Sequence, residues 1–375
     1  MKGELYHATT DDGWKLGVKR YRPKTQKQAP FPVVLCHGLA VNRYSVDFGI
    51  EGTKEWQQYS LAAFLSQGGS KKQTSFDVWV PELRGRGDSQ TFDHWNHPER
   101  FVWSLDEYVE KDIPAVLSFI KQRYAKEKHP VKKVLWVGKS MGGMLAYAYG
   151  QTPAGRTAFK GCVIIASPVV FSHSKQYIRL LVRLLPRRIA GPVRVGDRLE
   201  ENTMLAHLIQ DVIVQKGNIE KRILDQYVRN GFADTISSKV INHFALCVRR
   251  NDFTKYPRRP WVYDILDTLG ILDSYPWLKQ RYAPYSYTDH LDKFNTPCLI
   301  LAGKGDDLAH YEDVKYGFDH IGSKEKTFLL FGKHVKDSQG NIISSFDYGH
   351  LDINLGEKAR DEVFPIIYDW LISHC

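Results

Sequence analysis

Long hydrophobic segments are missing from this sequence. The first twenty residues contain no apolar stretch like that of a secretory signal, and no later window approaches about 18 uninterrupted apolar residues. We therefore expect neither secretion nor a membrane-spanning helix, and we predict a cytoplasmic protein.

Cysteine is scarce as well, with five residues in a chain of 375 and no CxxC pair or Cys/His spacing typical of a metal site. Cys36, Cys162 and Cys298 each lie in an apolar run that is typical of a buried strand. We expect core thiols in a reducing compartment, because such thiols pack as small hydrophobic side chains. No internal repeat is evident, and we predict neither a metal nor an organic cofactor.

Positive charge is present in excess and is unevenly placed. The net charge is +10, and residues 168–290 hold 19 Lys and Arg against 12 Asp and Glu, a local balance of +7. A basic face can attract anionic lipid or nucleic acid. No nucleic-acid motif accompanies it, so we predict no nucleic-acid partner, and a solvated basic surface remains the alternative to lipid contact.

Short apolar runs and helical patterns alternate through the first half of the chain, which predicts βαβ units and a parallel sheet. We expect an opening hairpin over residues 3–9 and 16–22. Further strands are expected at residues 32–36, 76–81, 134–137, 162–166, 297–302 and 327–331. Helices are expected near residues 53–65, 104–124, 141–149 and 357–372. Ser104 to Glu107 form a capping box, while Pro114 predicts a kink in the second helix.

The alternation stops after Pro168, and helical patterns follow with no clear strand until residue 290. We predict an α/β core of residues 1–167 and 291–375, with residues 168–290 inserted as a helical cap between the sixth and seventh strands. Ligands of open α/β sheets bind at the carboxyl ends of the strands, so such a cap would cover the binding site.

Residues 134–146, VLWVGKSMGGMLA, permit two interpretations. A phosphate-binding loop requires GxxxxGK[ST], but the position of its first glycine holds Lys133, and the apolar run before GKS leaves no residues for a loop. The other interpretation is GxSxG, a sharp turn from strand to helix in which Gly138 and Gly142 make room for a strained serine. We predict Ser140 as a nucleophile, with a plain glycine-rich turn as the alternative.

A serine hydroxyl needs a base to take its proton and a third group to orient that base. Asp306 lies just beyond the strand expected at residues 297–302, and His350 lies in a loop between the last strand and the last helix. This order of Ser, Asp and His is the one that a strand-turn-helix nucleophile requires. Asp307 and His334 are the alternatives for the acid and the base.

Acyl transfer also requires hydrogen-bond donors for the negative oxygen that forms during the reaction. We predict the backbone N–H groups of Met141, directly after the serine, and of Leu39, in the His-Gly turn after the third strand. His37 in that turn is expected to shape the loop and not to act as a base.

Five motifs in this order resemble the α/β-hydrolase superfamily: HGL at residues 37–39, the turn after the strand at 76–81, GxSxG, GxxD and GHxD. The resemblance covers nearly all of the chain outside the cap, and residues 103–116 are similar to a proline-containing helix of acid lipases. It implies the hydrolase fold, a catalytic triad of Ser140, Asp306 and His350, and oxyanion donors at Leu39 and Met141.

The sequence departs from acid lipases at Lys139, where they carry histidine, and it lacks their secretion signal. Polyhydroxyalkanoate synthases are related but use a cysteine nucleophile, so Ser140 favours hydrolysis. The tripeptide Arg86-Gly-Asp88, known from adhesion proteins, lies within a hydrolase-like turn. The role of Lys139 is left open.

We predict a serine hydrolase that cleaves carboxylic esters with an apolar acyl group. A thioesterase or acyltransferase with the same triad is the alternative, and a non-catalytic protein that binds lipid or a partner is the second. The cap opens with residues 175–188, where Arg179 and Arg183 lie one turn apart beside an apolar stripe of Ile178, Leu181, Val182 and Leu185. Such a helix could touch an anionic membrane or pack on the enzyme body. The oligomeric state is not indicated.

Overall fold

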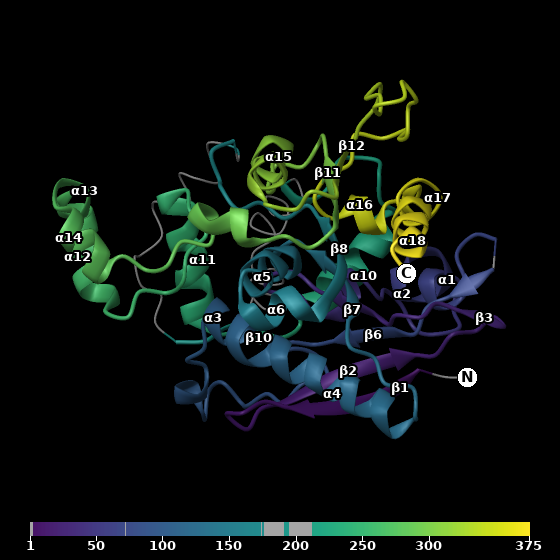
Figure 1. Ribbon diagram of the computed structural model, residues 1–375, viewed down its shortest axis with the longest axis horizontal. Coiled ribbons are helices and arrows are strands. Elements are labelled where there is room, and N and C mark those ends of the chain that lie inside the picture. The colour runs from purple at the N-terminus through teal and green to yellow at the C-terminus, as the bar shows by residue number, and fades with distance from the viewer. Residues whose placement is uncertain (1–2, 72, 174, 176–190, 195–211) are drawn as a thin grey trace.

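A computed structural model describes residues 3–71, 73–173, 175, 191–194 and 212–375 (Figure 1). Eight strands form one sheet in the order β1-β2-β6-β4-β7-β8-β11-β12. Their bounds are β1 (Glu4–Thr9), β2 (Lys15–Tyr21), β4 (Val33–Cys36), β6 (Val78–Pro81), β7 (Val134–Lys139), β8 (Phe159–Ile165), β11 (Cys298–Gly303) and β12 (Lys326–Phe331). The pairs β1-β2 and β2-β6 are antiparallel and the others are parallel, so the predicted hairpin and mostly parallel sheet are confirmed.

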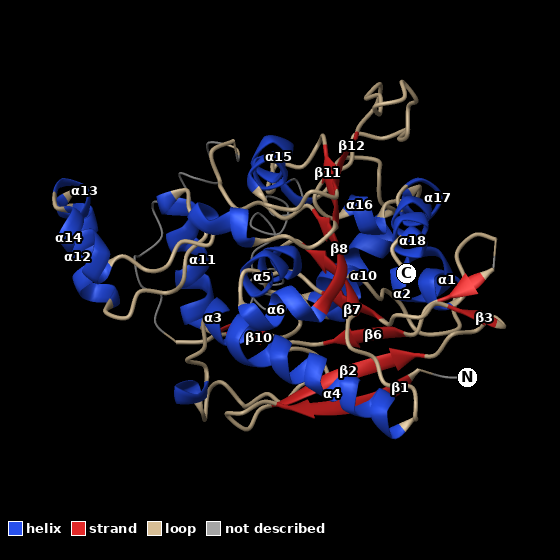
Figure 2. Ribbon diagram, viewed as in Figure 1, coloured by secondary structure: helices blue, strands red, loops and turns tan. Residues whose placement is uncertain are grey.

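Helices cover both faces of this sheet (Figure 2). On one side α4 (Ile113–Lys126) contacts β1, α5 (Met141–Gly150) contacts β7 and β8, and α15 (Tyr311–His320) contacts β11 and β12. On the other, α2 (Leu61–Ser66) contacts β2, β6 and α18 (Phe364–Ser373). Every residue of β4, β6, β7 and β11 is buried, as expected for strands covered on both faces. The shorter helices of this part are α1 (Lys54–Tyr59), α3 (Leu105–Glu107), α6 (Pro153–Ala158), α16 (Asp352–Leu355) and α17 (Ala359–Glu362).

Two predicted helices are interrupted, each for a local reason. The helix expected at residues 53–65 breaks at Ser60, whose backbone is extended and whose side chain caps α2 by accepting a hydrogen bond from the N–H of Ala63. The helix expected at 104–124 begins with the predicted capping box and passes through a π-helical turn at Tyr108–Asp112. Pro114, which cannot donate a backbone hydrogen bond, follows that turn.

The chain between β8 and β11, the sixth and seventh strands of the sheet, is mostly helical where it is described. Its helices are α10 (Lys221–Gly231), α11 (Ser238–Arg250), α12 (Pro260–Thr268), α13 (Ile271–Ser274) and α14 (Pro276–Tyr282). Contrary to expectation it also contains two short strands, β9 (Val193–Arg194) and β10 (Thr235–Ile236), which pair with each other. Two-residue strands are too short to leave an alternating pattern in the sequence.

This insertion rests on the loops that follow β4 and β6. The backbone N–H of Asn42 donates to the carbonyl oxygen of Gly231 at 3.1 Å, and Arg86 Nη1 donates to that of Asp234 at 3.1 Å. Helices α12 to α14 lie at the opposite end of the molecule from α17 and α18 (Figure 1). The exact division into core and cap stays a prediction. The amphipathic helix expected at residues 175–188 lies, apart from Lys175, outside the described residues.

Candidate active site

Ser140 sits on a sharp turn between β7 and α5. Its backbone dihedrals are φ 55° and ψ −120°, a conformation that a residue with a side chain rarely adopts. A Cβ atom added to Gly138 would lie 2.3 Å from the carbonyl oxygen of Gly142, and one added to Gly142 would lie 2.5 Å from that of Cys36. Only glycine fits at either position, so the GxSxG pattern forms the strained turn that the sequence predicts and not a plain glycine-rich turn.

Three predicted residues meet at this turn although they are far apart in sequence. His350 Nε2 lies 3.0 Å from Ser140 Oγ, and His350 Nδ1 lies 2.8 Å from Asp306 Oδ2. The other carboxylate oxygen of Asp306 accepts the backbone N–H groups of Leu308 at 2.9 Å and Ala309 at 2.7 Å. The carboxylate is therefore fixed in place, and it can hold the imidazole in the tautomer whose Nε2 accepts a proton from serine.

The surroundings favour a neutral His350. Burial lowers the pKa of its imidazole below the ordinary value, the charge of Lys139 lowers it further, and Asp306 opposes both. A neutral imidazole is the form that can act as a general base.

The alternative acid and base lie elsewhere. Asp307 forms an ion pair with Lys175 Nζ at 2.5 Å, and His334 is exposed after β12. Asp306 and His350 are thus the pair that the structure brings to Ser140. Their catalytic roles stay predictions.

Two backbone amides lie where oxyanion donors are expected. Met141 is the first residue of α5, and Leu39 follows Gly38, at which an added Cβ would come within 3.3 Å of Ser140 Cβ. Among the described residues, no acceptor takes the N–H of Leu39 or Met141. Both donors are therefore available to a bound oxygen near the serine.

His37 shapes the loop after β4. Its ring accepts the backbone N–H of Leu83 at Nε2 (3.2 Å), and its Nδ1 lies 2.9 Å from the carbonyl oxygen of Gly38, to which it donates. Burial lowers the pKa of this histidine to about 4, so it is neutral at pH 7. It connects the loops after β4 and β6, in the role expected from the sequence.

Asp352 is a residue of the site for which the sequence predicts no chemistry, only helix capping or a salt bridge. Its fully buried carboxylate accepts the backbone N–H of Gly349 at 2.9 Å and the side-chain amide of Asn218 at 2.5 Å. It also accepts the N–H of Gln215 at 3.3 Å. Asp352 thus fastens the loop that carries His350 to the insertion. The GHxD motif contained this residue, but only the partner groups from residues 215–218 reveal its role.

Lys139 is buried beside the triad, with 3% of its surface exposed. Its ammonium group has no hydrogen-bond partner among the described residues. Burial lowers its pKa to about 8, while the nearby charges of Asp306 and Asp352 raise it. A lysine in this place supplies positive charge to the triad without a direct bond to any of its members.

An eight-stranded, mostly parallel sheet with this serine turn and a Ser-His-Asp arrangement at the carboxyl ends of its strands defines an α/β hydrolase. Residues 32–334 match the family described as alpha/beta hydrolase fold, and the chain belongs to this family.

Its curated relatives include lipases. The chain is 24% identical over 385 residues to a tear acid lipase-like protein of Mesocricetus auratus, covering 95% of this chain and 84% of that one. It is 25% identical over 392 residues to lipase member K of Homo sapiens, covering 96% and 85%. A solved thermophilic esterase from Thermogutta terrifontis superimposes with a TM-score of 0.58 at 16% identity over 99% of each chain. The last likeness supports the fold alone.

Proposed function

We propose that this protein hydrolyses carboxylic esters with apolar acyl groups by way of an acyl-enzyme on Ser140. The family and the lipase and esterase relatives place the chain in the class of carboxylic ester hydrolases, without specifying its substrate. The observation that carries the finer proposal is the strained Ser140, whose Oγ lies 3.0 Å from a neutral, carboxylate-bound His350.

The reaction follows from the positions of these groups. His350 Nε2 takes the proton of Ser140 as its Oγ attacks the ester carbonyl, and Asp306 stabilises the imidazolium that forms. The N–H groups of Leu39 and Met141 bind the oxyanion of the tetrahedral intermediate. His350 then gives its proton to the departing alcohol, and water deprotonated by the same histidine releases the acid.

An apolar substrate is favoured by the side chains beside the triad. A hydrophobic cluster separate from the main core connects three segments: the loop after β4, the loop that carries His350, and the insertion. The backbone N–H of Leu351 also donates to the carbonyl oxygen of Ile213 at 2.7 Å, which ties the His350 loop to the insertion. Its buried members are Val41, Phe48, Tyr59, Ile213, Ile223, Tyr227, Leu351 and Leu355. Leu351 directly follows the histidine of the proposed triad, so apolar packing extends up to the reacting groups and supports an apolar acyl group there.

Covalent labelling with a fluorophosphonate tests this proposal. The wild-type protein should be labelled and Ser140→Ala should not, while His350→Gln should react at least about a hundredfold more slowly because serine loses its base. Equal labelling of Ser140→Ala would disprove the assignment. Ester and thioester substrates of graded acyl length then separate an esterase from a thioesterase, and added alcohol reveals an acyltransferase. A protein that is folded but inert to every probe would be a binding protein.

We also propose that the insertion contacts a lipid surface, through helices α12 to α14. Five large apolar side chains on these helices or at their ends are 52–66% exposed: Trp261, Ile265, Leu269, Tyr275 and Trp277. The first three are spaced four residues apart, with Leu269 directly after the last residue of α12, and so lie on one face of this helix and its C-terminal end. Two arginines precede that helix, and tryptophan and tyrosine are the side chains that favour membrane interfaces. No described helix is long and apolar enough to cross a membrane, so the contact would be peripheral.

Co-sedimentation with vesicles that contain an anionic phospholipid tests this contact. Wild type should bind, and Trp261→Ser/Leu269→Ser should bind at least about tenfold more weakly, because burial of each such side chain contributes roughly 1.5–3 kcal/mol. Trp95→Ser is the matched control, because Trp95 is 82% exposed but lies outside the insertion. Undiminished binding by the double variant, an equal loss in Trp95→Ser, or binding that does not depend on anionic lipid would refute the proposal.

A further inference from the structure

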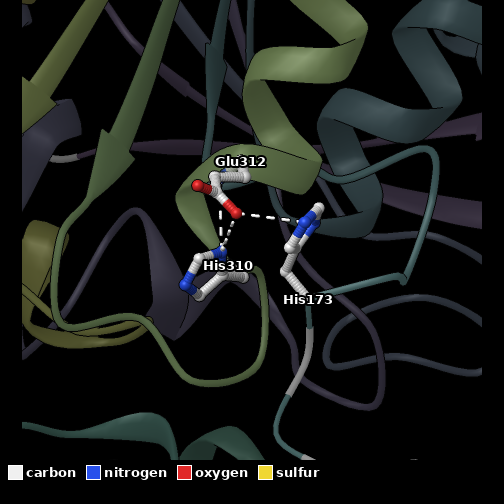
Figure 3. A group of neighbouring side chains, drawn as sticks. All are labelled: His173, His310 and Glu312. Carbon is white, nitrogen blue, oxygen red and sulfur yellow. Dashed lines mark hydrogen bonds and ion pairs between the residues drawn. The ribbon is translucent and has the colours of Figure 1, made fainter.

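We propose that His173, His310 and Glu312 form a zinc-binding site on the surface of this protein. Figure 3 shows the three side chains converging on one carboxylate: His310 and Glu312 come from the start of α15, and His173 from the segment that follows β8. Glu312 Oε2 lies 3.0 Å from His173 Nε2 and 3.9 Å from His310 Nδ1, and the three ligand atoms lie within 4.8 Å of one another.

A buried carboxylate orients the His173 ring. His173 Nδ1 lies 2.8 Å from Asp313 Oδ1, and Asp313 is fully buried and also accepts the backbone N–H groups of Ser172 and His173. Nδ1 therefore carries the proton that it donates to Asp313, which leaves the Nε2 lone pair facing Glu312. Metal-binding histidines almost always have such a second hydrogen bond, commonly to a carboxylate.

A lone pair and a carboxylate oxygen 3.0 Å apart repel each other unless a cation lies between them. A proton on His173 Nε2 would join His173 to Glu312 but would use no atom of His310. His310 Nδ1 accepts the backbone N–H of Glu312 at 3.4 Å as the N-cap of α15, which is a long hydrogen bond. A divalent metal ion would take the place of that hydrogen bond and accept lone pairs from both rings and from the carboxylate. The two imidazole rings are stacked with their centroids 5.6 Å apart, and both lie beside the Glu312 carboxylate (Figure 3).

Two imidazoles and one carboxylate suit zinc better than magnesium or calcium, which prefer oxygen ligands. Zinc in a tetrahedral site lies about 2.0–2.2 Å from its ligands, so ligand atoms are separated by roughly 3.4 Å. The separations of 3.0 Å and 3.9 Å lie within about half an ångström of this value, and the two histidine nitrogens, which are at most 4.8 Å apart, would close around the ion. The side chains of His173 and Glu312 are about half exposed, which leaves an entry path and room for water as the fourth ligand.

Binding would couple two parts of the chain. His173 lies at the beginning of the insertion, and His310 follows the Asp306 loop by only four residues. The ion would bridge them, and because it binds the folded form it would stabilise that form. The three ligands span 140 residues in no recognisable spacing, which explains why the sequence predicted no metal.

Isothermal titration calorimetry with Zn²⁺ on metal-free Ser140→Ala protein tests the site without relying on catalysis. One ion per chain should bind, and an X-ray absorption spectrum should fit nitrogen and oxygen neighbours at about 2.0–2.1 Å. A hundredfold excess of zinc over its Kd should raise the Tm by about 3 °C or more. Mg²⁺ and Ca²⁺ should neither bind at this site nor raise the Tm.

Matched variants locate the ion among the 14 histidines of the chain. His173→Gln and Glu312→Gln should each weaken zinc binding at least tenfold, and Asp313→Asn roughly 10–100-fold, because it orients a ligand without touching the ion. His320→Gln, at the other end of α15, should bind like the parent. The Glu312 side chain is about half exposed, so Glu312→Gln should fold normally. Undiminished zinc binding by this variant, or no zinc binding by the parent, would overturn the proposal. Neither outcome depends on whether the protein hydrolyses esters.

Discussion

Single charged residues near Ser140 shift the pKa of His350, the proposed base. His350 faces Asp306, which raises its pKa, and Lys139, which lowers it, in a pocket whose burial also lowers it. Lys139 in turn faces Asp306 and Asp352 and keeps its charge below about pH 8. The lysine therefore exerts its effect over the whole range in which the histidine titrates.

The substitution Lys139→Met tests this coupling. The acid limb of the kcat/KM profile follows the pKa of His350, and loss of a nearby positive charge raises that pKa. We expect the limb to move to higher pH by roughly half a unit or more. Methionine matches the lysine stem, so folding should persist. Lys133→Met, at an exposed position before β7, should leave the limb in place, and an unmoved limb in Lys139→Met would contradict the coupling.

At the level of elements, the loop between β12 and α16 carries the histidine but contains little regular structure. Its geometry depends on Asp352, the first residue of α16, whose carboxylate accepts hydrogen bonds from Gly349 and from residues 215 and 218 of the insertion. The insertion thus supports the position of the base in addition to packing against the His350 loop through apolar side chains.

Asp352→Asn should misplace His350. The new amide NH₂ group would face an N–H group that now donates to the carboxylate, and two donors cannot form a hydrogen bond. We therefore expect kcat to fall at least tenfold while KM changes little. Stopped-flow measurement of fluorophosphonate labelling should show the same loss. Asp361→Asn on α17, whose side chain is exposed, is the matched control. A variant with normal kcat would show that the loop is held by other contacts.

At the scale of the whole molecule, ion pairs made by buried arginines join segments distant in sequence. Arg20 on β2 binds Asp77 and Glu127, and Arg84 after β6 binds Asp12 and Asp112. The hydrogen bonds of Arg20 lower the pKa of Glu127 to about 2, from an ordinary value of 4.5. The amino-terminal hairpin is thereby fastened to the end of α4.

Glu127→Gln should reveal this contribution as a function of pH. A depressed carboxyl pKa stabilises the folded state above about pH 4.5, and that stabilisation is lost as the pH falls toward 2. The Tm of the wild type should exceed that of the variant at pH 7, and the difference should shrink between pH 5 and 2. Glu99→Gln, an exposed position, serves as control in the same calorimetric series. A difference independent of pH would refute the electrostatic explanation.

Local chemistry determined much of this structure. The strands of the sheet followed from apolar runs, the capping box at Ser104 from two side chains, and the turn at Ser140 from glycines that no other residue can replace. Ser140, Asp306 and His350 could be found because each follows a strand of the sheet in a fixed order. Such signals depend on neighbours in sequence, so the sequence alone sufficed.

Tertiary structure decided what depends on distant partners. Lys139 acquires its environment from the triad around it, and Asp352 acquires its role from residues 215–218. The convergence of His173 with His310 and Glu312 likewise requires the segment after β8 to lie against α15. Burial, hydrogen bonding and charge act through space, and no spacing along the chain records which remote groups folding brings within a few ångströms.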